Sequence, residues 1–406
     1  MARRAPAAPT PLRFRVGASA LVLVAVLLLL EGGARMVGAV LPGWAEAGPN
    51  GVMMVGDDQR LWAMAPGVWP NGTTRAKINA WGLRGELPEL PRPAGRQRIL
   101  VLGDSSFFGH GIADGETIPV RLGEDLRAAG LDVDSFNGAI PGYSTEQTLL
   151  LLDDVGFRHE PTLLVVGNLW SDNNVDAFRD ADLLRSVHVN ANPLMRAAFV
   201  RLLAGWADRA RGGNGAHLVT WTHDSHWPKD QDRRVPIQDY ARNLDRIVRE
   251  AREHGAGVVF IAPVNRGLAE GRYAEGAIWD VYFRAQAEVA AWHGLPVVSA
   301  KAALDADPAP ADQEFVDVMH PSALGAGLIA ARVATTLVEA GWPTTPLLGR
   351  AEPFDPSGLT DDARSYALPM DRGESPLSNL FPTEANPAPT SSEPPRPAPG
   401  GTTGRP

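Results

Sequence analysis

A serine and a histidine–acid pair are the residues of this 406-residue chain whose types and spacing best fit covalent chemistry. Ser105 stands in Gly-Asp-Ser-Ser, directly after the apolar run 99–102. Asp317 precedes His320 by three residues near the other end of the chain. A serine nucleophile, a histidine base and an acid that orients the base form the triad used for acyl transfer. We therefore take Ser105, His320 and Asp317 as candidate catalytic residues.

Each motif also has an interpretation without catalysis. Asp104 and Ser105 are residue types that cap helices. Asp317 and His320 fit an ordinary surface ion pair equally well. They also have the types of two metal ligands, but no third clustered ligand is evident in the sequence. We expect no metal and no cofactor.

Two segments between these motifs carry groups suited to stabilising a negative charge on oxygen. Residues 136–144 read FNGAIPGYS, and Gly142 can bring a bare backbone N–H close to a ligand. Residues 163–174 read LLVVGNLWSDNN, an apolar strand-like run followed by Asn168, Asn173 and Asn174. An Asn amide at the tip of a strand is a suitable oxyanion donor. Both segments are equally consistent with ordinary strand-to-helix turns.

The elements that must position these residues alternate between strand and helix. Strand-like runs cover 98–102, 132–136, 162–168, 257–263 and 296–299, and helix-like runs cover 116–129, 145–155, 237–254, 279–293 and 322–340. This rhythm predicts an α/β fold with a mainly parallel sheet sandwiched by helices. Ligands of such sheets bind beyond the carboxyl ends of the strands, where Ser105 is expected to lie.

The four segments, in this order, resemble the SGNH/GDSL hydrolase superfamily over residues 98–340. The segment NAWGLRG at 79–85 is similar to one that precedes the catalytic domain in membrane-anchored bacterial members. The resemblance implies the flavodoxin-like three-layer fold and a serine-dependent acyl-ester hydrolase of the esterase, lipase or carbohydrate O-deacylase type. It implies an acyl-Ser105 intermediate, with His320 as base and Asp317 as its orienting acid.

The same resemblance implies an oxyanion hole made by the N–H groups of Ser105 and Gly142 and the side chain of Asn173. Aligning Val175-Asp176 to the end of the family's Asn block selects Asn173, with Asn174 where the family usually has Asp. Asn168 is the runner-up because it directly follows the strand and a glycine.

Two other functions stay open beside ester hydrolysis. The same triad can O-acylate a cell-envelope polysaccharide, and a catalytically inactive domain can serve as a membrane-anchored scaffold. The expected substrate is an acyl ester on a small molecule, a lipid or a glycan. Acyl length and alcohol specificity are beyond the sequence, because a fold does not determine its substrate.

Composition divides the chain into five regions. Residues 1–15 are basic, and 16–41 begin with VGASALVLVAVLLLL, which predicts a signal anchor with the remainder exported or, if cleaved, secreted. Residues 45–97 form a lead-in, 98–345 the hydrolase domain, and 350–406 a Pro-rich tail expected to be disordered. Residues 175–235 interrupt the alternation. We expect this segment to be an insertion with an amphipathic helix at 194–210, which could form a lid over the site.

Charge and cysteine content exclude several classes of protein. The formal net charge is −9, which argues against nucleic acid as a partner, because phosphate binding needs a concentrated basic surface. The chain has no cysteine, so disulfides and thiolate chemistry are excluded.

Overall fold

A five-stranded parallel sheet forms the centre of the protein. The computed structural model describes residues 12–40, 54–57, 59–86, 88–176, 179–184, 232–272 and 279–360. The strands are β5 (Gln97–Leu102), β6 (Val133–Asn137), β7 (Leu163–Val166), β10 (Gly257–Ala262) and β11 (Val297–Ser299). Their order is β11-β10-β7-β5-β6, and every pair is parallel. This is the flavodoxin-like order, with the switch point between β5 and β7.

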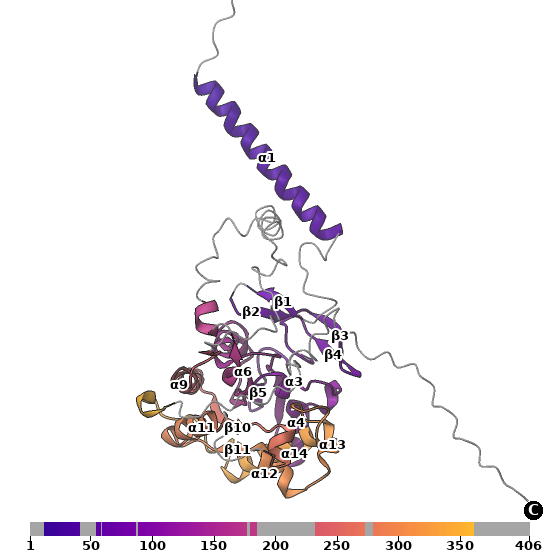
Figure 1. The fold of residues 1–406 in the computed structure, drawn as a ribbon, viewed down its shortest axis with the longest axis vertical. Helices are drawn as coiled ribbons and strands as arrows, with labels where there is room; N and C mark the ends of the chain where they lie inside the picture. Colours follow the sequence, from indigo (N-terminus) through magenta and orange to yellow (C-terminus); the bar gives the residue numbers. More distant parts are fainter. Residues whose placement is uncertain are drawn as a thin grey trace, which may run out of the picture. The chain divides into compact units, whose positions relative to one another are not determined.

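Helices cover both faces of this sheet, as Figure 1 shows. On one face α14 (Ala323–Glu339) packs against α4 (Ile118–Ala128) and α12 (Ala300–Ala306). On the other, α9 (Ile237–Glu253) packs against α5 (Thr145–Leu151) and α11 (Asp280–His293). Strands buried on both sides need continuous apolar runs, and β5 and β7 have them. The predicted α/β fold with a sandwiched parallel sheet is confirmed.

Short helical segments complete the fold. They are α3 (Ser105–Phe108), α6 (Trp170–Asn173), α10 (Arg266–Ala269) and α13 (Ala311–Glu314), with single turns at Asp114–Glu116, Leu152–Gly156, Phe157–His159 and Pro356–Gly358. Of these, α3 and α6 follow β5 and β7 at the carboxyl edge of the sheet.

The lead-in segment forms two antiparallel hairpins. One pairs β1 (Met54–Asp57) with β2 (Leu61–Met64), and the other pairs β3 (Gly67–Asn71) with β4 (Thr74–Ile78). Three apolar residues of β2 are buried. The hairpins therefore belong to the packed structure and supply part of its core.

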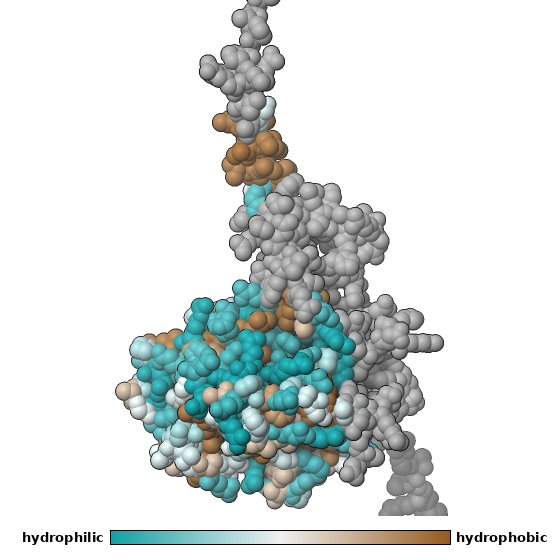
Figure 2. All heavy atoms as spheres, turned by 90° about the vertical axis from the view of Figure 1, so that its left-hand side faces the viewer, coloured by the Kyte–Doolittle hydropathy of each residue, from teal (hydrophilic) through white to brown (hydrophobic). Residues whose placement is uncertain are grey.

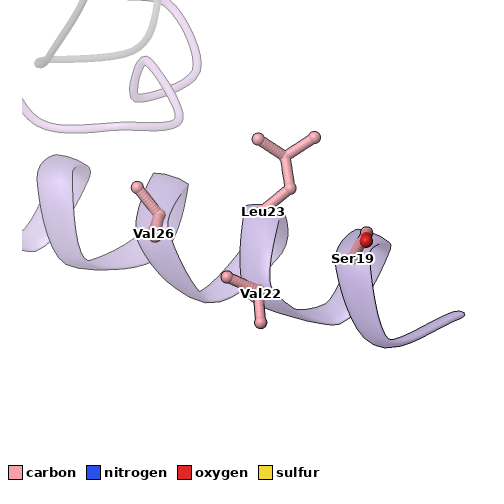
Figure 3. A pocket seen from close by; sticks show the side chains of 4 residues that line it. All are labelled: Ser19, Val22, Leu23 and Val26. Carbon is pink, nitrogen blue, oxygen red and sulfur yellow. The ribbon is translucent and has the colours of Figure 1, made fainter. Parts of the chain in front are cut away.

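The apolar stretch near the N-terminus lies in α1 (Leu12–Val40). Figure 2 shows hydrophobic side chains gathered on it, and Figure 3 shows a shallow hollow on its surface lined by Ser19, Val22, Leu23 and Val26. Within the described part of the chain, no helix combines the length and apolar character needed to cross a membrane.

Two other expected boundaries differ from the structure or fall outside it. Residues 350–360 are packed: the backbone N–H of Phe354 donates to Asp245 on α9, and the Trp292 indole donates to the Glu352 carbonyl. Residues 350–360 therefore do not belong to a disordered tail. Of the expected insertion at 175–235, only the two ends are described, and β8 (Val175–Asp176) pairs there with β9 (Asp232–Arg233). The helix expected at 194–210 and residues 361–406 lie outside the described residues.

Candidate active site

Ser105 stands in the first turn of α3, at the tip of β5. Asp104 caps this helix, since its carboxylate accepts from the Ser106 N–H at 3.0 Å. Burial raises the pKa of Asp104, and the Ser106 N–H and the nearby His320 partly offset that rise. The capping role considered for Asp104 is therefore present, and it fixes the turn that carries Ser105.

The Phe107 ring anchors this turn to the sheet. It is buried between Gly103, after β5, and Gly167, after β7. A Cβ at Gly103 would lie 2.6 Å from Phe107 Cδ2, and one at Gly167 would also overlap the ring. Glycine is therefore required at both strand tips for α3 to lie close to the sheet.

His320 and Asp317 occupy the loop between α13 and α14. The Asp317 carboxylate accepts from the backbone N–H groups of Met319 at 2.7 Å and His320 at 2.8 Å. Ser322 caps α14, accepting from the Gly325 N–H at 3.3 Å. Capping at both places fixes the loop, so the His320 side chain is held with little freedom.

The structure brings the three predicted catalytic residues together. His320 Nε2 lies 2.8 Å from Ser105 Oγ, and His320 Nδ1 lies 2.7 Å from Asp317 Oδ2. Burial alone would raise the pKa of Asp317, but its bond to His320 and the two backbone N–H groups lower it to about 2. Asp317 is thus ionised at neutral pH and suited to hold a proton on His320 Nδ1.

The backbone N–H groups predicted for the oxyanion hole have no protein acceptor in the described part of the chain. This holds for Ser105 in the first turn of α3 and for Gly142 in the loop after β6. The two loops are tied together, because the Ile140 N–H donates to the Gly103 carbonyl at 3.1 Å. Gly142 is buried and has φ +78°, a conformation that favours glycine.

The side-chain contacts of the three candidate asparagines separate their roles. Asn168 is fully buried, and its amide donates to Tyr143 O at 3.3 Å and to Thr148 Oγ1 at 3.0 Å. Both amide hydrogens of Asn168 are therefore used in hydrogen bonds within the protein. Asn173, at the end of α6, donates to Trp170 O at 3.3 Å and has a second amide hydrogen. Asn173 therefore keeps a donor for substrate, and Asn174 is described only through its backbone carbonyl, which accepts from the Arg234 backbone N–H at 2.8 Å. The assignment of Asn173 to the oxyanion hole stays a prediction.

His110 is a residue of this site that the sequence did not single out. Its ring lies 4.6 Å from that of His320, with a tilt of 48°. Burial, then the nearby His320, lowers the pKa of His110 to about 4, so it is neutral at neutral pH. Potential ligand atoms of His110, Asp317 and His320 lie within 4.8 Å of one another, so the described residues contain one group that could hold a metal ion. A histidine five residues after Ser105 gave no signal of this proximity.

Two further buried residues support the turn around Ser105. Arg84, in the lead-in, donates to the carbonyls of Phe108 at 2.8 Å and Gly109 at 2.6 Å, and it pairs with Asp114 at 2.8 Å. The Asn137 amide donates to the Phe108 carbonyl from the end of β6. Arg84 thus holds the end of α3, which gives the 79–85 segment a structural role.

A serine–histidine–aspartate array at the switch point of a flavodoxin-like sheet defines an α/β enzyme of the hydrolytic class. The sequence model of the GDSL-like Lipase/Acylhydrolase family matches residues 101–328, more than half of the chain. The chain belongs to this family and is an enzyme acting on ester bonds. No curated protein matches it.

Several solved structures are similar to parts of the chain. The lipase/acylhydrolase from Enterococcus faecalis is 17% identical, with a TM-score of 0.39, covering 59% of this chain and 95% of that one. The psychrotrophic esterase EstA from Pseudoalteromonas sp. is 16% identical, with a TM-score of 0.37, covering 61% and 100%. A two-domain esterase active on acetylated mannans is 14% identical, with a TM-score of 0.39, covering 65% and 54%.

Proposed function

We propose that this chain hydrolyses acyl esters through a covalent acyl-Ser105 intermediate. The observation that carries the proposal is the continuous hydrogen-bonded chain from Ser105 Oγ through His320 to Asp317. A hydroxyl bonded to a neutral imidazole can lose its proton as it attacks, and the ionised Asp317 stabilises the imidazolium that results.

The reaction has two halves. Ser105 Oγ attacks the ester carbonyl carbon while its proton passes to His320 Nε2. The tetrahedral intermediate collapses, the C–O bond to the alcohol breaks, and His320 returns the proton to the leaving alcohol oxygen. Water then attacks acyl-Ser105, giving its proton to His320. Release of the carboxylic acid breaks the Ser105 ester bond and returns the proton to Oγ.

Three donors are proposed to hold the oxyanion. They are the N–H groups of Ser105 and Gly142, which have no acceptor among the described residues, and the second amide hydrogen of Asn173. Removing one such donor costs roughly 10²- to 10³-fold in rate. Asn173→Ala is therefore expected to lower kcat by that factor, whereas Asn174→Ala leaves kcat near wild type.

The test compares the full chain with its Ser105→Ala and His320→Ala variants on p-nitrophenyl acetate and butyrate. We expect both variants to lose nearly all activity, because residues of one triad act as a unit. A fluorophosphonate probe should label the wild type and not Ser105→Ala. Turnover by Ser105→Ala would overturn the proposal. Labelling of wild type without turnover would instead indicate transfer to an acceptor other than water, as an O-acyltransferase requires.

We propose further that the chain is exported, with α1 acting as its targeting segment. Leu21, Leu28 and Leu29 are more than half exposed along this helix, and the basic residues Arg13 and Arg15 precede the apolar run. Cell fractionation of the full chain beside a variant lacking residues 1–41 tests this. Export is supported if only the full chain reaches the membrane or the medium, and equal cytosolic distribution of both refutes it.

A further inference from the structure

The loop that carries Gly142 is held on both sides of this residue. Gly142 takes part in two peptide groups. The first contains the Pro141 carbonyl and the Gly142 N–H, and the second contains the Gly142 carbonyl and the Tyr143 N–H. Peptide groups are planar, and in a trans peptide the N–H points away from the C=O. Whatever binds the Pro141 carbonyl therefore sets the direction of the Gly142 N–H.

Trp62 binds that carbonyl. Its indole N–H donates to Pro141 O at 3.1 Å, across 79 residues of sequence. The Trp62 side chain is buried, and its backbone carbonyl accepts from Tyr143 Oη at 2.6 Å. The centres of the Trp62 and Tyr143 rings lie 5.5 Å apart, with the ring planes at 73°. Strand β2 of the lead-in thus binds the loop at Pro141 and Tyr143, the residues directly before and after Gly142.

Arg234 binds the second peptide group. Its guanidinium donates to Gly142 O at 3.0 Å and to Gln147 Oε1 at 3.1 Å. It also forms a two-point ion pair with Asp180, at 2.9 and 2.8 Å, in which both side chains are buried. A buried, two-point pair fixes the guanidinium plane, which gives the bond to Gly142 O a defined direction.

The same arginine reaches the loop of the other predicted donor. The Arg234 N–H donates to Asn174 O at 2.8 Å, and the guanidinium lies 5.8 Å from the centre of the Trp62 ring. Trp62 and Arg234 therefore meet beside the Gly142 loop, although they lie far apart in the sequence.

We propose that Trp62 and Arg234 are positioning residues that aim the Gly142 N–H at the acyl oxyanion. The proposal rests on the proposed function, in which Gly142 is an oxyanion donor. It also gives the lead-in hairpin a part in catalysis, since the donor peptide is held from β2. Because the loop is already fixed in the folded protein, the Gly142 N–H does not have to be oriented during the reaction.

The sharpest variant is Trp62→Phe, which removes the indole N–H and keeps an aromatic ring. We expect kcat to fall about 10- to 100-fold, below the 10²- to 10³-fold cost of deleting a donor, because Gly142 is still present. KM should change less than threefold, since the oxyanion charge exists only in the transition state. Trp69→Phe is the matched control: Trp69 donates its indole N–H to the Ala65 carbonyl at 2.7 Å, away from the Gly142 loop. That variant should keep wild-type kcat.

Arg234 is tested in a way that separates positioning from stability. Arg234→Met alone leaves Asp180 buried without its partner, so the double variant Arg234→Met with Asp180→Leu replaces the whole pair by apolar groups. We expect the double variant to regain thermal stability and to keep a kcat at least tenfold below wild type. Arg234→Lys should restore part of kcat, because one N–H of lysine can still reach Gly142 O.

Arg98 supplies the control for a buried arginine. It is fully buried near the start of β5, at the opposite end of the strand from Ser105, and it donates to His159 O at 2.8 Å. Arg98→Met should lower the melting temperature and leave the kcat of the folded enzyme unchanged.

Wild-type kcat in both Trp62→Phe and the Arg234/Asp180 double variant would overturn the positioning role, and if the double variant does not fold, Trp62→Phe decides. Failure of the proposed function has a different signature, since Ser105→Ala would then retain turnover. The two failures are therefore distinguishable in one set of assays.

Discussion

Replacing Gly103 by alanine tests whether close packing at the tip of β5 places the nucleophile. Gly103 has φ +156°, outside the range that side-chain-bearing residues readily adopt. An added Cβ would lie 2.6 Å from Phe107 Cδ2, where ordinary contact begins at 3.4 Å. The ring must therefore retreat by about 0.8 Å, the difference between those distances. Because Phe107 follows Ser105 by two residues on α3, the nucleophile must move with it.

The magnitude follows from two costs. Backbone strain of this kind costs about 1–3 kcal/mol, and overpacking costs about 1–3 kcal/mol. We expect Gly103→Ala to lower the free energy of unfolding by about 2–6 kcal/mol. Misplacement of a reacting group by about 1 Å can cost 10²-fold in rate, so kcat/KM should fall by about that factor.

The assay pairs thermal unfolding with hydrolysis of p-nitrophenyl acetate. Gly95→Ala is the control, because Gly95 has φ +83° and an added Cβ there meets nothing within 4 Å. Gly95→Ala should lower the free energy of unfolding through backbone strain alone and keep wild-type kcat/KM. A Gly103→Ala variant with unchanged melting temperature and kcat/KM would refute the argument that Phe107 packing sets the position of Ser105.

Three further predictions concern charged and titrating groups. Asp317→Asn should lower kcat about 10³- to 10⁴-fold with an unchanged melting temperature, because the amide no longer holds the required tautomer of His320; a loss below tenfold would contradict this. Zn²⁺ should inhibit the wild type, and His110→Phe should raise the half-inhibiting Zn²⁺ concentration at least tenfold. Inhibition is measured relative to the metal-free rate of each protein. Equal inhibition of both would exclude His110 as a ligand. Burial raises the pKa of Asp172 to about 8, above its ordinary 3.8, despite two bonds from Thr145. The folded state therefore favours protonated Asp172, so the free energy of unfolding of the wild type should fall as pH rises from about 4 through 8. Chemical denaturation should show a flatter dependence of this free energy on pH for Asp172→Asn. An identical pH dependence for the two proteins would refute the shift.

The centre of the sheet was predictable because its three middle strands are buried on both faces. β7 and β10 are uninterrupted apolar runs, β5 is apolar from Ile99 to Leu102, and α9 shows its buried residues at helical spacing. The lead-in hairpins were not predicted. β3 is mostly exposed and contains Pro70, so it shows neither an apolar run nor clean alternation. The two-residue strands β8 and β9 are too short to leave any pattern.

The site divides in the same way. Ser105, Asp317 and His320 were recognisable because their residue types carry the chemistry and stand beside strand or helix ends. Trp62 and Arg234 were not, since their contacts with the Gly142 loop span 79 and 92 residues. Such partners are fixed by tertiary packing, which leaves no local signal in the sequence.

The order of the catalytic parts along the chain has a consequence for biosynthesis. Ser105 and Gly142 leave the ribosome early, whereas His320 is followed closely by α14, which packs against α4 from the first half of the domain. Domains are made from the N-terminus onward. A nascent chain therefore holds its nucleophile without a base until nearly the whole domain has been synthesised. Esterase activity is accordingly a direct report that the chain has been synthesised through α14 and that this helix has packed against α4.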